Sequence, residues 1–371
     1  MNNKKAKKLI VAMSLLLVLT ACNKEMDEDR VIIKEPGKTI TIIDDKDNEA
    51  GEAVISVVKI DRYENMSITD WLNENTVIVS RENTTLEKMS LSELANAHPR
   101  SLYLFNLDNK EYKLLKEKSN THLGEATLSA DKKNLLYYEY TLGDPAFSVM
   151  NMDTLKDFSI RGPNIAGAMS AKWGDNETVV GADYSGGAYL AHISGKITSI
   201  EGLKGKALVI VEQIKDKIYY NTTSDGSLWR LDLATKETVD LNLKNIYRVF
   251  PSPDENQMLL IQGSGAKQSL LLCDTNGGNR KTIAEGNEIS GVSWSGDQRL
   301  IAYNMKTDMN GNTVNGLYIY DTLKGEATQV AVGVQYLSTS WSPSSEALAY
   351  AEWDGSKYDS SIIYLEYTLR K

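Results

Sequence analysis

The sequence predicts an all-β protein built from a repeated four-stranded unit. Residues 293–303 read SWSGDQRLIAY and residues 340–350 read SWSPSSEALAY, so Ser, Trp, Ser, Ala and Tyr recur at an interval of 47 residues. Between Glu288 and Val332, four short apolar runs alternate with turns that contain Gly, Asn and Asp, which is typical of an antiparallel sheet. One such sheet cannot bury both of its faces, but copies packed around an axis can. The sequence therefore predicts a β-propeller, with the Trp as a wedge between neighbouring blades.

Five weaker copies precede these two, beginning near Trp71, Leu128, Trp173, Val209 and Phe250. The copy at Val209 has lost both the aromatic residue and the turn signature. Seven copies give ~43 residues each, which is typical of WD40-like blades, so seven blades are favoured over six. The strand-like run from Val54 to Ile60 has no copy of its own, and the last copy supplies only three strands. We predict that this run is the fourth strand of the last blade and closes the ring.

The repeat, W-S-P-D-x-L-A-Y followed by an apolar–Tyr–apolar–x–Asp strand, resembles that of the TolB-type, WD40-like β-propellers of bacterial envelopes. The resemblance extends from Val54 to the C-terminus and is most evident at Trp294, at Trp341 and at residues 252–254. The chain is also similar to YqgU-type lipoproteins. This resemblance implies a fold and an envelope location but no particular activity, because propellers have many unrelated functions.

The N-terminus predicts export and a lipid anchor. Four lysines precede an apolar run from Leu9 to Leu19, which is too short to span a bilayer but suits a signal peptide. The run ends in Leu-Thr-Ala-Cys, which resembles a lipobox with cleavage after Ala21 and lipidation of Cys22; the alternative is an ordinary signal peptide with an accidental cysteine. We therefore predict a signal peptide at 1–21, a solvated tether at 22–52 and the propeller at 53–371. Within the tether, the strand-like runs Val31–Ile33 and Ile40–Ile43 flank Pro36 and Gly37, which suggests a hairpin docked on the propeller.

Charge and cysteine content limit the partners. The chain carries 41 basic and 50 acidic residues, and loss of residues 1–21, which contain four lysines and no acid, changes the net charge from −9 to −13. Such a surface argues against nucleic acid and against adhesion to anionic lipid headgroups. The lipid on Cys22 must then hold the protein at the extracytoplasmic face of the cell membrane. Cys273, the second cysteine, is predicted to be a small buried residue.

Long or polar loops join the second strand of a blade to the third at Arg81–Arg100, Thr141–Ala146, Tyr184–Ala188, Lys306–Asn315 and Trp353–Ser360. They share one face of a propeller with the connections between blades. One of them contains Ser90 and Glu93 in a capping-box pattern, which predicts a short helix through about Ala97. Exposed aromatic residues in such loops are preferred anchors for binding. The candidate binding residues on this face are Tyr184, Trp353, Tyr358 and His98.

No pattern in the sequence predicts a cofactor, a metal site or a catalytic residue. The three histidines have no metal-ligand spacing, and Asp308–Asn312 suits an Asn-Gly hairpin turn better than a calcium loop. The leading hypothesis is a non-enzymatic module that binds a protein or peptide in the envelope. The alternative is an enzyme that processes envelope polysaccharide with loop carboxylates, for which the candidates are Asp144, Asp183, Asp225 and Asp354. Six tyrosines are predicted to belong to the blade core: Tyr137, Tyr138, Tyr303, Tyr318, Tyr320 and Tyr350.

Overall fold

The computed structural model describes residues 30–35, 38–43, 53–143, 145–163, 165–309, 312–334 and 338–369. The chain divides into two compact units, Met1–Glu52 with Arg370–Lys371, and Ala53–Leu369. In the first unit β1 (Arg30–Glu35) pairs antiparallel with β2 (Lys38–Ile43), so the predicted hairpin is present. Its turn residues Pro36 and Gly37 lie outside the described residues, and its docking on the propeller stays a prediction.

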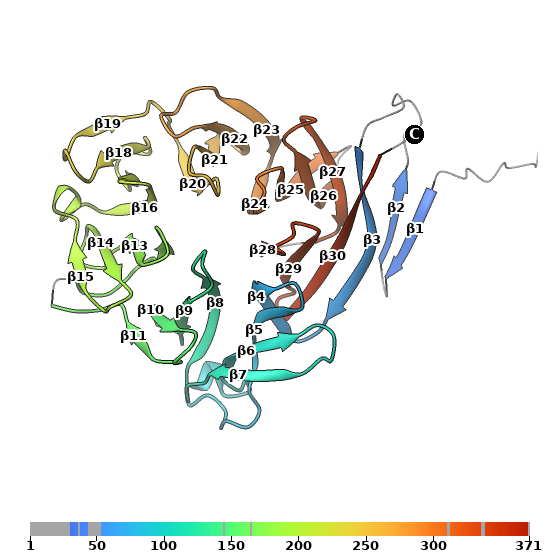
Figure 1. Cartoon of the computed structure of the whole chain (residues 1–371), viewed down its shortest axis with the longest axis horizontal. Helices are drawn as coiled ribbons and strands as arrows, with labels where there is room; N and C mark the ends of the chain where they lie inside the picture. The colour runs from blue at the N-terminus through green and yellow to red at the C-terminus, as the bar shows by residue number, and fades with distance from the viewer. Residues whose placement is uncertain are drawn as a thin grey trace, which may run out of the picture. The chain divides into compact units, whose positions relative to one another are not determined.

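The second unit is a β-propeller of seven four-stranded antiparallel blades, which confirms the predicted fold class and blade number (Figure 1). Blade 1 contains β4 (Met66–Asn73), β5 (Thr76–Glu82), β6 (Arg100–Asn106) and β7 (Tyr112–Lys116). Blade 2 contains β8 (His122–Leu128), β9 (Asn134–Tyr140), β10 (Ala146–Asn151) and β11 (Asp157–Ser159). Blade 3 contains β12 (Lys172–Trp173), β13 (Thr178–Ala182), β14 (Ala188–His192) and β15 (Ile197–Ser199). Blade 4 contains β16 (Leu208–Ile214), β17 (Lys217–Thr222), β18 (Trp229–Asp232) and β19 (Thr238–Asp240).

The remaining three blades complete the ring. Blade 5 contains β20 (Ile246–Pro251), β21 (Gln257–Ser264), β22 (Lys267–Asp274) and β23 (Lys281–Gly286). Blade 6 contains β24 (Glu288–Trp294), β25 (Leu300–Met309), β26 (Asn312–Asp321) and β27 (Glu326–Val332). Blade 7 contains β28 (Ser338–Trp341), β29 (Ala347–Trp353), β30 (Tyr358–Leu369) and β3 (Ala53–Tyr63). In every blade except the seventh, the four strands follow one another along the chain.

Blade 7 closes the ring with strands from both ends of the propeller unit. β3 pairs antiparallel with β30, in a register that runs from Ala53 opposite Leu369 to Tyr63 opposite Ser360. The predicted role of Val54–Ile60 as the fourth strand is therefore confirmed, and the strand extends further at both ends. Its main-chain groups cover the edge of β30, which would otherwise be open to other chains.

The predicted tryptophan wedge is present at four of the seven boundaries between blades. Each indole N–H donates to a main-chain carbonyl on the inner strand of the preceding blade. The bonds are Trp71 to Ser340 at 3.0 Å, Trp173 to Thr127 at 3.0 Å, Trp294 to Phe250 at 3.2 Å and Trp341 to Ser293 at 3.4 Å. Trp71 is only 1 % exposed, so this wedge combines apolar burial with a directed hydrogen bond.

Most of the predicted core residues are buried. Of the six tyrosines, Tyr137, Tyr303, Tyr320 and Tyr350 are buried, whereas Tyr138 and Tyr318 are only half-buried. Cys273 is fully buried on β22, and this burial raises the pKa of its thiol to about 12. The thiol is therefore protonated at neutral pH, as expected for a small packing residue.

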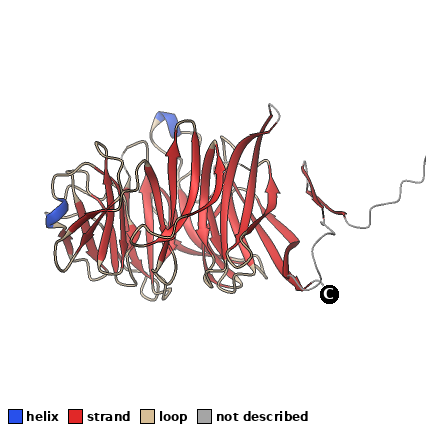
Figure 2. Cartoon of the chain, turned by 90° about the horizontal axis from the view of Figure 1, so that it is seen from above, coloured by secondary structure: helices blue, strands red, loops and turns tan. Residues whose placement is uncertain are grey.

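We call the face that carries the second-to-third-strand loops and the connections between blades the loop face. Hydrogen bonds join the two kinds of segment, for example from Asn83 to Glu117 at 2.9 Å and from the amide of Gly187 to the carbonyl of Lys206 at 2.8 Å. Figure 2 shows the blades edge-on, with strand ends and loops on both faces. The predicted polar loop Lys306–Asn315 is instead mostly strand, because β25 and β26 pair as far as Met309 and Asn312.

The predicted helix in the first-blade loop is wrong in type and length. The structure has a three-residue 3-10 helix, η1 (Ser92–Leu94). Its N-cap residue is Leu91, which makes no side-chain capping hydrogen bond. The amide of Ser90 donates a hydrogen bond to Asn120 Oδ1 in the neighbouring connection at 2.8 Å. A second 3-10 helix, η2 (Glu201–Leu203), lies between blades 3 and 4.

Candidate functional site

Two predicted binding residues, Trp353 and Tyr358, face each other where the hairpin of β29 and β30 opens onto the loop face. They are paired across the two strands, and their ring centroids lie 4.7 Å apart. Trp353 is 38 % exposed, although it ends a strand whose other apolar residues are buried. The indole is thus held by a neighbouring ring while one side remains open to solvent.

These rings begin a continuous series of contacts across three blades, which we call the aromatic band. Its members lie at the loop-face ends of strands in blades 7, 1 and 2, and they are Trp353, Tyr358, Arg100, His122, Tyr140, Tyr138 and Phe147. The Arg100 guanidinium lies 4.8 Å from the Tyr358 ring centroid, and the His122 and Tyr140 rings lie 5.1 Å apart. Tyr138 then contacts Tyr140 at 5.0 Å and Phe147 at 5.5 Å. Aromatic pairs at these separations attract one another beyond the effect of burial alone.

Arg100 is the cation of this band and is 9 % exposed. Its Nε donates to the Ser80 hydroxyl at 3.1 Å, and its Nη2 donates to the Ser80 carbonyl. No carboxylate among the described residues forms an ion pair with it. Burial lowers the pKa of Arg100, but an arginine remains protonated in proteins, so a positive charge is fixed here.

His122 fixes the main chain next to Arg100. Its Nδ1 accepts a hydrogen bond from the Arg100 amide at 3.2 Å, so the neutral ring carries its proton on Nε2. Burial and the nearby Arg100 both lower the pKa of His122. The imidazole is therefore a neutral donor at pH 7, not a second cation.

A second group of charged residues lies on the inner strands of blades 2 to 5, which surround the propeller axis (Figure 1). Lys172 on β12 forms an ion pair with Glu212 on β16, which is 4 % exposed. Burial raises the pKa of Glu212, while Lys172 and Arg248 lower it. Glu125 on β8 is exposed to solvent, yet desolvation by its surroundings raises its pKa and Arg248 opposes this effect.

The other two predicted binding residues lie elsewhere on the loop face. His98 donates a hydrogen bond from Nδ1–H to the carbonyl of Leu86 at 2.8 Å, and this contact fastens the loop between β5 and β6. Tyr184 on blade 3 is 37 % exposed, and its hydroxyl donates to the carbonyl of Pro145 on blade 2 at 3.2 Å. Both residues thus have structural contacts of their own, and only Tyr184 offers a substantial exposed ring.

The loop aspartates proposed for catalysis accept hydrogen bonds within turns. Asp183 accepts from the amide of Ala166 at 2.9 Å and from Ser185. Asp225 accepts from Ser227 and from the Trp229 indole, and Asp354 accepts from the amides of Ser356 and Lys357. These bonds lower the pKa of Asp225 and of Asp354, which favours the ionised form. Asp144 lies outside the described residues.

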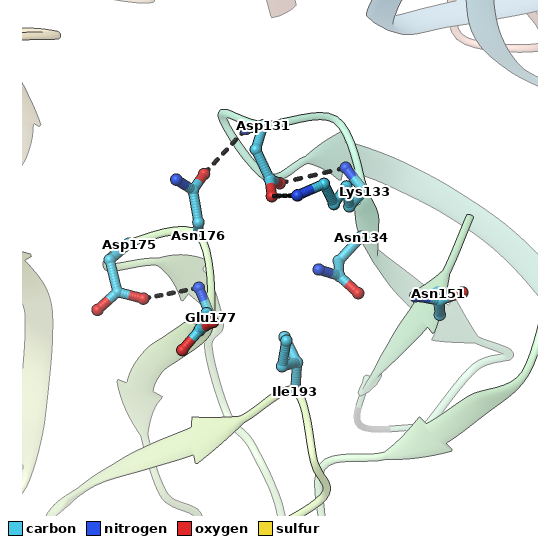
Figure 3. A pocket seen from close by; sticks show the side chains of 8 residues that line it. All are labelled: Asp131, Lys133, Asn134, Asn151, Asp175, Asn176, Glu177 and Ile193. Carbon is cyan, nitrogen blue, oxygen red and sulfur yellow. Dashed lines mark hydrogen bonds and ion pairs between the residues drawn. The ribbon is translucent and has the colours of Figure 1, made fainter. Parts of the chain in front are cut away.

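A polar hollow of about 490 Å³ lies on the opposite face, between blades 2 and 3 (Figure 3). It is lined by Asp131, Lys133, Asn134, Asn151, Asp175, Asn176, Glu177 and Ile193. Two of its acids already have partners within the protein: Asp131 pairs with Lys133 at 3.3 Å, and Asp175 accepts a hydrogen bond from the amide of Glu177 at 2.8 Å.

Among the described residues, no three His, Cys, Asp or Glu side chains are grouped so as to hold a metal ion. No helix in the same part of the chain is both long and apolar enough to cross a membrane.

Comparison with known proteins supports the fold. No family model matches the chain, and no curated protein matches its sequence. An oligogalacturonate lyase from Vibrio parahaemolyticus superposes with a TM-score of 0.62 at 9 % identity, covering 84 % of this chain and 98 % of that one. The β-propeller domain of Cps50 (Swd1) from Myceliophteria thermophila gives 0.56 at 12 % identity, covering 84 % and 100 %. TolB from Acinetobacter baumannii is also similar, with 0.47 at 14 % identity, covering 79 % and 64 %. At such identities the likeness shows the propeller fold alone.

The sequence did not point to Arg100, His122 or Tyr140. Arg100 meets Tyr358 from the other end of the propeller, whereas His122 and Tyr140 become neighbours through the register of β8 and β9. Glu125 and Glu212 gave a weak signal that was missed. Each is the one acidic residue of a mostly apolar strand, a position in which an acid is seldom found without a partner. That pattern alone would have suggested a charged group at the propeller axis.

Proposed function

We propose that this protein is a lipid-anchored, extracytoplasmic β-propeller that binds a protein or peptide partner through its loop face. The aromatic band is the observation that carries this proposal. It combines a partly exposed Trp, several Tyr and a buried Arg, the residue types that dominate the energetics of protein interfaces. Because its members stand at strand ends and contact one another, the surface is held in place before a partner arrives.

The anchor rests on the N-terminal sequence, which resembles that of bacterial lipoproteins, including the YqgU-type group. Only the thiol of Cys22 can take a diacylglyceryl group after cleavage behind Ala21. We expect Cys22→Ala to release the protein into the medium or to leave it unprocessed, as measured by fractionation and by incorporation of labelled palmitate. A Cys22→Ala protein that is still processed and membrane-bound would reject the anchor.

The binding surface is tested by capture of a partner from intact membranes by the lipidated protein. We expect Trp353→Ala to weaken capture at least ten-fold, since loss of an interface Trp often costs about 2 kcal/mol or more. Tyr184→Ala should weaken capture to a smaller extent. Leu323→Ala is the matched control, because Leu323 is 79 % exposed in a turn of blade 6 between its third and fourth strands, away from the loop face. Equal capture by all three variants would exclude the loop face as the binding surface.

The alternative function, processing of an envelope polysaccharide, is favoured by one specific observation. Glu125 is a solvent-accessible acid with a raised pKa on an inner strand, which are properties of a general acid. Glu125→Gln should then abolish release of reducing ends from purified wall polysaccharide, without altering the melting temperature. Activity that persists in this variant, or that is absent from the unaltered protein, would reject the enzymatic alternative.

A further inference from the structure

We propose that Arg100 and the aromatic rings around it form a site for a single carboxylate of the bound peptide. The carboxylate is either an Asp or Glu side chain or a chain terminus. This inference rests on the proposed function and specifies which chemical group of the partner the loop face recognises. It is carried by the position, the contacts and the unused donors of Arg100.

The Arg100 guanidinium carries more hydrogen-bond donors than its contacts with Ser80 use. A guanidinium carries five N–H groups, and its contacts within the described part of the chain are those to the hydroxyl and the carbonyl of Ser80. The side chain is nonetheless nine-tenths buried. A buried cation without an anion is unfavourable. A carboxylate would accept two parallel hydrogen bonds from this group and neutralise its charge.

The stacking of Arg100 is compatible with this role. Tyr358 contacts the guanidinium at 4.8 Å, and Trp353 lies behind Tyr358 at 4.7 Å. A cation–π contact uses the face of the planar guanidinium and leaves its donor edge available. The rings therefore fix the orientation of the group without consuming the hydrogen bonds that an anion would need.

The neighbouring polar groups are neutral donors. His122 bears its proton on Nε2, because its Nδ1 accepts from the Arg100 amide. The Tyr140 ring lies 5.1 Å from that imidazole, and burial raises the pKa of its hydroxyl to about 12, so the hydroxyl remains protonated. Neutral donors beside a fixed cation favour one anion but provide no second positive charge.

The surrounding charges favour a peptide over a polyanionic glycan. Glu82 lies opposite Arg100 in the register of β5 and β6. The negative charge of Glu125, on the inner strand of blade 2, contributes to the raised pKa of Tyr140. Once the signal peptide is removed, the whole chain has a net charge of −13. A polymer with a carboxylate on every sugar would bring further negative charges towards these acids. A peptide can present one carboxylate among uncharged residues.

The test uses three N-acetylated tetrapeptides and the full mature chain in detergent micelles. The first is Ala-Tyr-Glu-Ala with an amidated C-terminus, the second is Ala-Tyr-Gln-Ala amide, and the third is Ala-Tyr-Gln-Ala with a free C-terminal carboxylate. Binding is followed by the fluorine resonance of Trp353 in protein labelled with 5-fluorotryptophan, which is assigned by its loss in Trp353→Phe. We expect saturable binding of the first or the third peptide, which identifies the source of the carboxylate, and at least ten-fold weaker binding of the second.

Variants of Arg100 decide whether this residue is responsible. Arg100→Gln should weaken binding of the acidic peptide at least ten-fold, and Arg100→Lys, which keeps the charge but loses the planar donor edge, should weaken it less. The matched control is Arg81→Gln on the same blade, where Arg81 stacks on the Tyr112 ring at 4.4 Å, and it should bind as the unaltered protein does. If Arg100→Gln fails to fold, binding of the acidic peptide is measured in Tyr140→Phe and in Arg100→Lys. Unchanged binding in both variants would overturn the inference.

The outcomes separate this inference from the proposed function. Equal binding of all three peptides, or binding of a glucuronate disaccharide in place of any peptide, overturns the carboxylate site for peptides. If partner capture still depends on Trp353 in that case, the loop face remains a binding surface. If neither capture nor peptide binding occurs, both proposals fail.

Discussion

The boundary between blades 7 and 1 and the boundary between blades 3 and 4 hold neighbouring blades together in different ways. At the first, the Trp71 indole donates to the Ser340 carbonyl, while the Ser360 hydroxyl accepts from the Ile68 amide at 2.8 Å and donates to the Met66 carbonyl at 3.0 Å. At the second, Gln213 occupies the wedge position and the ion pair of Lys172 with Glu212 joins the inner strands.

The difference shows that the propeller does not depend on one kind of contact at every boundary. A fully buried indole with a satisfied N–H gives stability that is largely independent of pH. An ion pair with one buried member gives stability that depends on the charge of that member. The copy near Val209, in which Gln213 occupies the wedge position, is also the copy that has lost the turn signature.

The largest effect should follow from removal of β3, which completes blade 7. A chain that begins at Asp61 loses most of the ladder between β3 and β30 and exposes the edge of β30. We expect aggregation or loss of the cooperative unfolding transition, measured by size-exclusion chromatography and thermal melting. A chain that begins at Ala53 is the control and should behave as the mature protein does. A soluble chain from Asp61 with an unchanged melting temperature would contradict this account of closure.

The wedge positions at the two boundaries should respond unequally to substitution. Trp71→Ala should lower the free energy of unfolding by about 3–5 kcal/mol, since it empties a fully buried site. Trp71→Phe, which keeps a ring but leaves the Ser340 carbonyl without its donor, should cost about 1–2 kcal/mol. Gln213→Ala should cost under about 1 kcal/mol, because the side chain is only partly buried. Denaturant unfolding measures all three, and equal losses for Trp71→Ala and Gln213→Ala would show that the wedge has no special role.

The sequence was sufficient for the fold because each blade carries its own local signals. The turn at Ser295 is an example, in which the hydroxyl donates to Asp297 at 2.5 Å and accepts from the Leu300 amide at 2.8 Å, all within six residues. Closure by Val54–Ile60 was predictable as well, since one strand was missing at one end of the repeat and one unpaired strand was present at the other.

The candidate site was only partly predictable, since it is built from distant segments. Trp353 and Tyr358 were found because an aromatic residue at the edge of a turn is visible in one stretch of sequence. Arg100 meets Tyr358 across a separation of more than 250 residues, and nothing in the local pattern distinguishes it from a surface arginine. Tyr138, which was expected in the core, proved to be half-buried in the aromatic band because the end of β9 reaches the loop face.

The effect of the ion pair between blades 3 and 4 should depend on pH, unlike the effects at the wedge positions. Lys172→Met removes the positive charge next to Glu212, while the more weakly coupled Arg248 still lowers the pKa of Glu212. The folded-state pKa of Glu212 is raised by burial and should rise further in this variant. An acid whose pKa is higher in the folded state destabilises the protein increasingly as the pH rises from the ordinary glutamate value, about 4.3, through the raised value.

The loss in Lys172→Met should therefore be small near pH 4 and reach about 1–3 kcal/mol near pH 8, a range reduced because Lys172 is 45 % exposed. Melting temperatures measured across this range in one buffer system test the prediction. In the double variant Lys172→Met/Glu212→Gln the pH-dependent part of the loss should disappear, because no ionisable group remains in the pair. If the single variant loses the same stability at every pH, Glu212 does not carry the charge that joins these two blades, and the contrast between the two boundaries reduces to packing.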